Sequence, residues 1–436
     1  MDTLPIAKYI HNKYVYFTLA NFAKYVNSMG VGRDEIVINV SQEYIDDLSG
    51  GLLHSDEKFF QLYDFWAANV GRFALDPLGF KQMVFSNTSN HDFAAGRIEI
   101  PSEIEGVPVR TNVTGRFRPL IFMPTTNGDG TTVPDYQQYA RPFQGGYSIG
   151  HIDITAGTFT CPVWDKRTSK MLILSNKHVF SPLVNGVLPT TKCIGDPKVG
   201  DAILQPGAYD ILNQQLGDKT DPKFLVANFL RQGDYRPWWV GARLKFDSAV
   251  ATPIDESVCT RTAYGIDGDL VDGTVDPVVD MHVRLAGRTS GYRDTTITQT
   301  SMWVPMCTCE DQYIGGSALN CCIPTPLFSC LIWGPDVRIM EDLFETGPNT
   351  AAPGDSGSIA VSDDNRVVGQ LFGGDASTGI GVCGKASNIE KGLDVSFTKL
   401  LAPVLPTVPW TTILAAGTLL AGAAVAYPYI RSKLKV

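Results

Sequence analysis

The segment that most constrains the fold is Pro353-Gly354-Asp355-Ser356-Gly357-Ser358, which sets a serine between two glycines. A serine in such a turn cannot hide its hydroxyl among neighbouring side chains, so we predict that Ser356 is a nucleophile. Gly354 leaves room for a substrate carbonyl to approach the backbone. The N–H groups of Gly354 and Ser356 can then point at the oxygen that becomes negative during acyl transfer, which predicts an oxyanion hole.

A nucleophilic serine needs a base, and the base needs an acid that orients it. Leu172-Ile-Leu-Ser-Asn-Lys-His178-Val-Phe places a histidine just after an apolar run that is typical of a buried strand. Phe246-Asp247-Ser-Ala-Val places an aspartate at the start of another such run. His178 precedes Asp247, and Asp247 precedes Ser356, so the order of the three groups is His, Asp, Ser.

These segments and their order resemble the chymotrypsin/trypsin-like serine proteases. Gly287-Arg288-Thr289-Ser290-Gly291 resembles the start of the family's second barrel. Residues 367–374 resemble the strand along which a substrate backbone pairs in that family. Ser148–Phe159 and Ile203–Asp210 resemble a divergent microbial branch that lacks the signal peptide and disulfides of the digestive enzymes. The resemblance covers about residues 95–400.

The resemblance implies a mostly β fold with two six-stranded antiparallel barrels. His178 and Asp247 would belong to the first barrel, and Ser356 to the second. It also implies roles for the three residues: His178 takes the proton of Ser356, and Asp247 holds the ring tautomer and stabilises the imidazolium. The substrate-binding residues that it implies are Thr350, Phe372, Gly373 and Gly374.

The resemblance says less about specificity and activation. It places the floor of the primary pocket near Thr350, which would be uncharged, and it leaves Asp375 as an alternative acid that is more often solvated. The family usually buries a new N-terminus against the aspartate before the serine, here Asp355. The stretch Gly145–Gly150 is not a clean cleavage signal, so we expect activity without processing.

Alternatives exist for each member of the triad. His151 is the other histidine near enough in sequence to act as a base, although its context is different. Asp255 is the alternative acid, but it follows Pro253 and Ile254 instead of opening an alternating strand, so Asp247 is preferred. A Gly-Asp-Ser-Gly turn alone could be a hairpin. The three residues together, in this order, are the stronger signal.

Composition and charge exclude several classes of protein. The chain has 436 residues, of which 44% are hydrophobic and 19% charged, which fits two or three folded domains and excludes a disordered chain. Its net charge of −9 and the lack of a basic stripe argue against nucleic acid as a partner. Polypeptides are the expected substrates, and no cofactor is expected.

The nine cysteines are expected to be mostly reduced, because none lies beside His178 or just before Ser356. Five fall in one region, namely Cys307, Cys309, Cys321, Cys322 and Cys330. A structural zinc is disfavoured there because the spacing is not a regular Cys-x2-Cys pair and no histidine is close. One or two disulfides are the alternative in an oxidising compartment.

The chain divides into four segments. Residues 1–95 are predicted to be a helical accessory region, because apolar residues recur at helical spacing in 14–26 and 58–70. Residues 96–146 are predicted to form a strand-containing extension and linker, and 147–400 the protease domain. Within that domain, two hairpins are predicted, 158–164 with 171–175 and 359–361 with 367–372.

The last segment, 401–436, is predicted to be a transmembrane anchor. Residues 411–430 are mostly apolar and long enough to cross a bilayer core of about 30 Å. Trp410, Tyr427 and Tyr429 match interfacial anchors, and the small residues between them would allow self-association of the helix. A buried helix or a coat-protein tail is the alternative. The basic residues after 430 favour the cytosolic side of the membrane for the C-terminus. Without a signal sequence, the catalytic domain is expected on the same side. The topology of the chain therefore stays open.

The sequence therefore predicts a membrane-tethered serine endopeptidase that hydrolyses peptide bonds through an acyl-enzyme. The alternative is a structural or assembly protein, such as a viral shell component, that keeps a protease fold and has a membrane-active tail. A third hypothesis is that the protein is a binding module that uses the protease fold as a recognition platform.

Overall fold

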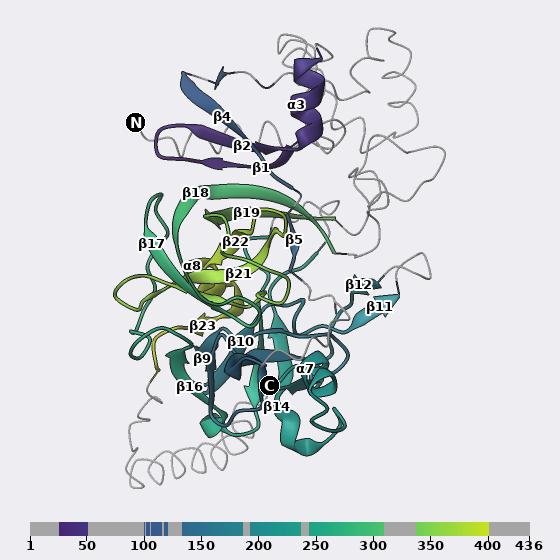
Figure 1. Ribbon diagram of the computed structural model, residues 1–436. Coiled ribbons are helices and arrows are strands. Elements are labelled where there is room, and N and C mark those ends of the chain that lie inside the picture. The colour runs from purple at the N-terminus through teal and green to yellow at the C-terminus, as the bar shows by residue number, and fades with distance from the viewer. Residues whose placement is uncertain are drawn as a thin grey trace, which may run out of the picture. The chain divides into compact units, whose positions relative to one another are not determined.

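The computed structural model gives a mainly β protein, as the sequence predicts (Figure 1). It describes residues 26–50, 100, 102–104, 106–115, 117–120, 133–185, 192–236, 244–308 and 337–400, with Ile104, Asn185, Lys192, Cys307 and Val337 as backbone only. The chain splits into two compact units at Leu400, and the second of them, with the predicted anchor at 411–430, lies outside the described residues. Within the described ranges, no helix is both long and apolar enough to cross a membrane.

The first sheet carries the predicted base and acid. Strands β9 (Cys161–Asp165) and β10 (Met171–Ser175) form the predicted hairpin, with Met171 opposite Trp164. Every residue of both strands is buried, which explains their uninterrupted apolar runs. The order along the sheet is β23 (Val395–Ser396), β9, β10, β15 (Ala249–Pro253), β14 (Leu225–Gln232), β13 (Ala202–Leu204), β7 (Ser148–His151) and β8 (Gly157–Thr158).

The second sheet flanks the predicted nucleophile. Its main strands are β17 (His282–Gly287), β20 (Ile359–Val361), β21 (Val367–Asp375), β22 (Ile380–Lys385), β19 (Val337–Thr346) and β18 (Gly291–Cys307), in that order. A further pairing of β17 with β18 closes these six strands into a ring. The first sheet has no such closing pair among the described strands, so two six-stranded barrels remain a prediction.

The N-terminal region differs from its prediction. Residues 26–40 form two strands, β1 (Val26–Val31) and β2 (Ile36–Val40), and only α3 (Gln42–Ser49) is helical among residues 26–50. The helical prediction is therefore wrong for 26–40, where the β-branched run of β2 favours a strand. The segments at 14–25 and 58–70 lie outside the described residues.

These N-terminal strands extend the second sheet. β1 pairs with β18, with Met29 opposite Trp303, and the sheet continues through β2 to β4 (Val107–Val113) and β3 (Glu103–Ile104). Another short strand, β5 (Arg118–Pro119), pairs with β21. Both β3 and β4 lie in the predicted strand-containing extension, which thus joins the sheet of the predicted protease domain.

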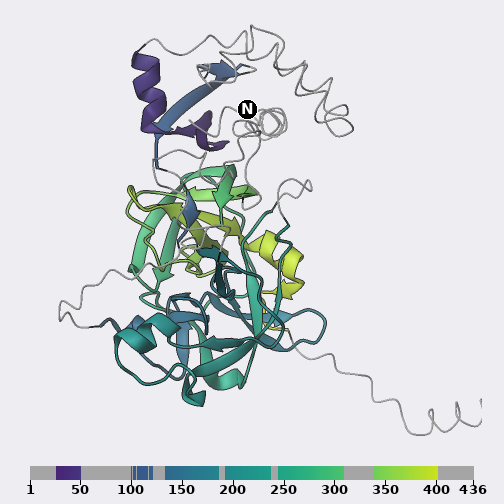
Figure 2. The ribbon, with the colours of Figure 1, turned by 90° about the vertical axis from the view of Figure 1, so that its right-hand side faces the viewer.

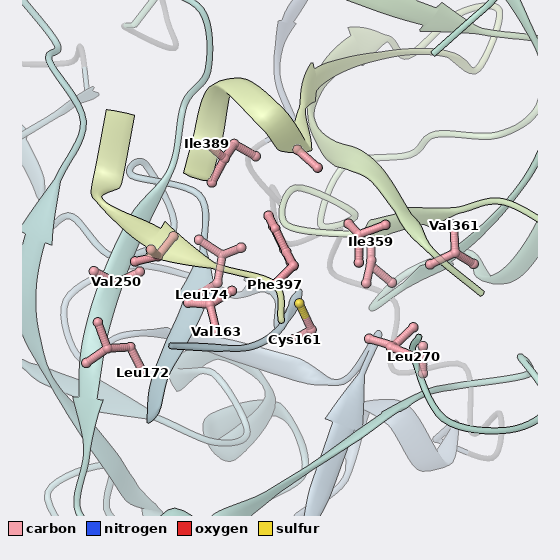
Figure 3. Close-up of a cluster of buried hydrophobic side chains, with 14 of the residues drawn as sticks. Cys161, Val163, Leu172, Leu174, Val250, Leu270, Ile359, Val361, Ile389 and Phe397 are labelled. Carbon is pink, nitrogen blue, oxygen red and sulfur yellow. The ribbon is translucent and has the colours of Figure 1, made fainter. Parts of the chain in front are cut away.

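The two sheets share a buried core. It contains Cys161, Leu172, Leu174 and Val250 from the first sheet and Ile359 and Val361 from the second, and Figure 3 shows these side chains together. Ile389 of α8 (Ala386–Leu393) and Phe397 complete the cluster, and Figure 2 shows α8 beside the junction of the sheets. Burying each of these side chains contributes roughly 1.5–3 kcal/mol, which fixes the two sheets against each other.

The remaining elements are short. They are β6 (Phe143–Gly145) paired in parallel with β16 (Cys259–Ala263), β11 (Leu183–Asn185) paired with β12 (Lys192–Ile194), the helix α7 (Ala208–Asn213), and the 3-10 helices η2 (Asp135–Gln137), η3 (Pro222–Phe224) and η5 (Glu256–Val258).

Candidate active site

His178 and Asp247 meet because they flank paired strands. His178 follows the end of β10 and Asp247 precedes β15, and these strands are antiparallel neighbours in which Ser175 lies opposite Ala249. The ring Nδ1 of His178 lies 2.5 Å from Oδ2 of Asp247, and the backbone N–H of His178 donates to Oδ1 at 3.3 Å. Both side chains are almost completely buried. The structure thus brings together two of the three predicted catalytic residues.

Neighbouring groups hold Asp247 in place. The side-chain amide of Asn176 donates to the backbone oxygen of Asp247 at 2.7 Å, and the Tyr235 hydroxyl lies 3.5 Å from Oδ2. Burial and the charge of Asp247 raise the pKa of Tyr235 well above its ordinary value, so this hydroxyl stays neutral. With Nδ1 of His178 bound to the carboxylate, the proton-accepting nitrogen is Nε2. Among the described residues, the buried Nε2 atom has no hydrogen-bond partner.

Ser356 lies on a turn that the first sheet holds. The backbone N–H of Thr158 donates to the carbonyl of Ser356 at 2.7 Å, and the Thr158 hydroxyl donates to the carbonyl of Gly354 at 2.9 Å. Gly354 and Gly357 both have φ of +100°, a conformation that other residues rarely adopt. A Cβ on Gly357 would lie 1.9 Å from the carbonyl oxygen of Thr158, so that only glycine fits there.

The segments that carry His178 and Ser356 approach each other across Gly157. A Cβ on Gly157 would lie 2.4 Å from Cγ2 of Val179, the residue after His178, and 3.1 Å from the carbonyl oxygen of Ser356. The Ser356 hydroxyl donates to the carbonyl of Phe372 at 3.3 Å. The serine is buried.

Asp355 fixes the loop that contains the predicted oxyanion donors. Its Oδ1 accepts hydrogen bonds from the backbone N–H groups of Thr289 and Ser290 at 2.8 and 2.9 Å, and its Oδ2 accepts one from Ala352 at 2.9 Å. Burial raises the pKa of Asp355, and these hydrogen bonds oppose the rise. The carboxylate is therefore satisfied by backbone donors.

A buried ion pair connects the two sheets next to this loop. Nε of Arg288 lies 3.0 Å from Oδ2 of Asp210 on α7, a second guanidinium nitrogen contacts Oδ1, and both residues are about 1% exposed. The Ser148 hydroxyl also donates to Asp210. The backbone N–H of Arg288 donates to the Thr158 hydroxyl at 2.9 Å, which links the pair to the turn of the nucleophile. The sequence contained both residues in segments of family resemblance but gave no sign that they pair.

The predicted pocket residues lie together at β21 and the loop before Ser356. Thr350 is buried, and its hydroxyl is used internally, 2.8 Å from the Thr346 hydroxyl and 2.6 Å from the carbonyl of Gly347. The floor expected near Thr350 thus carries no charge of its own. Gly373 and Gly374 form the end of β21, where a Cβ on either would clash with backbone oxygens.

Another part of the chain already lies along this strand. Pro119 and Arg118 of β5 pair antiparallel with Gly373 and Gly374, respectively. The next residue, Leu120, accepts a hydrogen bond on its carbonyl oxygen from the backbone N–H of Gly354 at 2.9 Å. This is one of the two N–H groups predicted to form the oxyanion hole. Sequence reasoning missed this segment, because Phe-Arg-Pro-Leu has no periodicity or motif that indicates such a position.

The structure places the alternative residues elsewhere. His151 lies in a separate network, with Nε2 at 3.2 Å from Asp201 and Nδ1 accepting from the N–H of Asp153. Asp255 caps a 3-10 helix by accepting from the N–H of Ser257. Asp375 accepts hydrogen bonds from residues of its own turn and, at 2.9 Å, from the N–H of Gly115. Burial disfavours its charge, but the hydrogen bonds outweigh burial and lower the pKa of Asp375.

The described cysteines behave in two ways. Cys161, Cys259 and Cys383 are buried free thiols, and burial raises the pKa of Cys259 to about 12, so none of the three is predicted to be nucleophilic. Cys193 is disulfide-bonded, so among the cysteines whose side chains are described three are reduced and one is not. The cluster from Cys309 to Cys330 lies outside the described residues.

Comparison with known proteins finds similarity to bacterial proteases among solved structures. No family model matches the chain, and no curated protein does. Among solved structures, it is similar to Thermobifida fusca Protease A, with a TM-score of 0.36, 15% identity and 59% of this chain and 98% of that chain covered. Nocardiopsis Protease has a TM-score of 0.35 and 13% identity, with 59% of this chain and 98% of that chain covered. Cellulomonas bogoriensis chymotrypsin has a TM-score of 0.34 and 15% identity, with 59% of this chain and 100% of that chain covered. The chain resembles chymotrypsin-like bacterial serine proteases. At such identities and TM-scores the likeness carries no argument about function, which has to follow from the side chains.

Proposed function

We propose that the protein is a serine endopeptidase in which Ser356, His178 and Asp247 form the catalytic triad. The observation that carries this proposal is the buried contact of 2.5 Å between His178 and Asp247, which leaves Nε2 of the ring without a partner among the described residues. The segment of His178 packs across Gly157 from the glycine-framed turn that holds Ser356. A histidine oriented in this way near a serine fits nucleophilic catalysis.

The chemistry follows from the groups. The Ser356 hydroxyl turns from the carbonyl of Phe372 toward Nε2 of His178, which takes its proton as the oxygen attacks a peptide carbonyl carbon. Asp247 holds the tautomer and stabilises the imidazolium. The imidazolium then protonates the leaving amine, and the C–N bond breaks. Water, activated by the same histidine, hydrolyses the ester and restores Ser356.

The oxyanion hole in this proposal consists of the N–H groups of Gly354 and Ser356. Preorganised donors stabilise developing charge because they need no reorganisation during the reaction, and one such donor is worth about 2.7–4 kcal/mol. Thr158 and Asp355 supply the rigidity, since both bind the loop by hydrogen bonds of 2.7–2.9 Å. We further propose that six strands of the first sheet form a second barrel and that 147–400 is the catalytic domain.

The proposed substrates are polypeptides that pair along β21. Gly373 and Gly374 allow a backbone to approach this strand closely, at the edge where β5 now pairs, and Thr350 gives the primary pocket an uncharged floor. Phe372, whose carbonyl accepts the Ser356 hydroxyl, adds a buried apolar ring beside the nucleophile. Apolar side chains are therefore favoured over charged ones in the primary pocket.

A fluorophosphonate probe tests the activity. The reagent should label the full-length chain and a Leu120→Glu variant, in which residues 117–120 are displaced from the site, but should not label either chain when Ser356→Ala is added. Hydrolysis of a peptide library, followed by mass spectrometry, would then report the pocket preference. Failure to label any chain with an intact Ser356 would favour a structural or assembly protein, or a binding module, that keeps the protease fold.

We also propose that residues 411–430 tether the protease to a membrane, with the catalytic domain on the cytosolic side. The support is the length and apolar character of this segment alone. Alkaline carbonate extraction of full-length, Lys399-truncated and Leu420→Arg chains tests the tether, because a central arginine should weaken insertion by about 2.5–3.5 kcal/mol. Extraction of the full-length chain as easily as the truncated one would refute it. Protease digestion of sealed vesicles would report the side, and crosslinking within them would report self-association.

A further inference from the structure

The segment Phe117–Leu120 occupies the site as the acyl half of a substrate would. It runs antiparallel to β21, with Arg118 opposite Gly374 and Pro119 opposite Gly373. Leu120 then directs its carbonyl oxygen at the N–H of Gly354, at 2.9 Å. A peptide ready for attack needs both of these features, a strand alignment and a carbonyl on the oxyanion donor.

The two end residues of the segment are buried, and the two residues between them are not. Phe117 and Leu120 are 2% and 3% exposed, whereas Arg118 is exposed and Pro119 half-buried. Leu120 packs in a cluster that includes Ala351 and Leu371, which lie next to the predicted pocket floor and to Phe372. The leucine therefore fills an apolar pocket beside the nucleophile.

Phe117 is held in a second apolar site. It packs with Phe372, Met306 and Val382 in a separate cluster. Two residues earlier, the N–H of Gly115 donates to Oδ2 of Asp375 at 2.9 Å. The segment is thus fixed at both of its ends, by an aspartate at the end of β21 and by the oxyanion donor before Ser356.

Gly373 is required for this close approach. A Cβ at this position would lie 2.8 Å from the carbonyl oxygen of Arg118 and 2.6 Å from Cε of Met306. The backbone of β5 therefore lies directly on the glycine. If Phe117–Leu120 only covered the edge of the sheet, the carbonyl of Leu120 would have no need to point at the N–H of Gly354.

We propose that the protein cleaves itself in cis at the peptide bond after Leu120, and that Phe117–Leu120 is a template for its specificity. The inference rests on the proposed peptidase activity and adds to it a cleavage site and a preference for leucine before the cut bond. It also replaces the expectation of activity without processing.

The reaction uses only the chain and water. Ser356 Oγ forms a bond with the carbonyl carbon of Leu120, its proton passes to His178, and the Leu120 oxygen becomes the oxyanion beside Gly354. The C–N bond to Ile121 then breaks, and His178 gives its proton to the departing nitrogen. Water hydrolyses the resulting ester, which yields a Leu120 carboxylate and a free serine. The two products are residues 1–120 and a chain that begins at Ile121.

The test is to express the full-length chain and to determine the masses and new N-termini of the products. Wild type should separate into 1–120 and a fragment that begins Ile121-Phe-Met, and Ser356→Ala should stay whole. Leu120→Met, which conserves volume and polarity, should still be cut. Leu120→Glu, which would bury a charge in an apolar pocket, should be cut more than about 100-fold more slowly. The matched control Leu212→Glu, at a leucine that is 60% exposed, should be cut like wild type.

Dilution separates a reaction in cis from one in trans. The rate constant should not change with protein concentration, and wild type should leave an added tagged Ser356→Ala chain uncut. Cleavage that slows on dilution would overturn the cis reaction, and cleavage at another bond would overturn the site.

Failure of the inference can be told apart from failure of the proposed function. If wild type stays whole while fluorophosphonate labels Ser356 in Leu120→Glu, the enzyme is active and the self-cleavage is refuted. If no variant is either labelled or cut, both proposals are refuted together.

Discussion

The buried ion pair between Arg288 and Asp210 provides a direct test of what stabilises the structure around the site. Arg288 follows β17 of the second sheet, and Asp210 lies on α7 beside the first sheet, so the pair spans the junction. Both side chains are only 1–2% exposed. We predict that Arg288→Met and Asp210→Asn each destabilise the protein far more than the loss of an exposed pair.

The magnitude follows from desolvation. Removing one partner leaves the other charge buried without compensation, which costs about 3–5 kcal/mol. For a domain of 150–250 residues, 1 kcal/mol lowers the melting temperature by about 2–4 °C, so each single change should lower it by roughly 6–20 °C. Replacing both partners by apolar residues, Arg288→Met with Asp210→Leu, leaves no unpaired charge and should recover most of the loss.

Urea denaturation, with the free energy of unfolding extrapolated to water, measures these effects on the Ser356→Ala background, where self-cleavage cannot interfere. The matched control is Arg167→Met, which removes an ion pair with Asp394 whose partners are 65% and 43% exposed, and it should leave the curve nearly unchanged. If the double variant is as unstable as the single ones, an unpaired charge is not the cause of the loss, and the reasoning fails.

Three further predictions concern the site and the second sheet. Asp247→Asn should lower turnover of a fluorogenic peptide by about 10⁴, through loss of the productive tautomer of His178, while leaving the melting temperature within a few degrees; a loss under tenfold would contradict the assigned role. Gly357→Ala should abolish labelling of Ser356 by fluorophosphonate, because the new Cβ would meet the Thr158 carbonyl at a φ of +100°, whereas Gly200→Ala, at a positive φ with open space around it, should still be labelled. Hydrogen bonds that the protonated His282 ring donates to Asp363 and Asp294 raise its pKa above the unfolded value, so the stability that His282 adds is fully present below about pH 6.5 and is lost as the pH rises through the raised pKa. His282→Gln should therefore destabilise the protein at pH 5 more than at pH 9 in urea denaturation, and an equal effect at both values would refute the assignment.

Much of the β structure could be predicted because it is local. The hairpin of β9 and β10 and that of β20 and β21 both form where apolar runs flank polar turns. The proximity of His178 and Asp247 also follows from the sequence, since each residue lies at the end of a buried strand. Family resemblance then supplied the pairing of these strands, which periodicity alone does not determine.

The parts that the sequence did not predict depend on contacts between distant segments. Residues 26–40 were expected to be helical, but they gain partners on β18, about 270 positions along the chain. Arg288 and Asp210 are ordinary charged residues until the fold buries both. Phe117–Leu120 becomes informative only when β21 and Gly354 lie beside it, because its own composition favours no particular partner.

If the proposed self-cleavage occurs, control of this site would rest on its occupancy and not on the order of the oxyanion loop. The backbone N–H groups of Thr289, Ser290 and Ala352 already donate to Asp355, so this proposal needs no new N-terminus to hold the loop. Cleavage after Leu120 would then act by allowing residues 117–120 to leave.

Uncleaved Leu120→Glu should consequently hydrolyse a short leucine peptide at nearly the rate of cleaved wild type, because both have an open pocket and the same loop. The measurement is turnover per Ser356 that fluorophosphonate can titrate, with Leu212→Glu as the control for an added charge. If uncleaved Leu120→Glu is slower by tenfold or more while the titrated fraction is equal, the terminus at Ile121 contributes to catalysis, and control by occupancy alone is wrong.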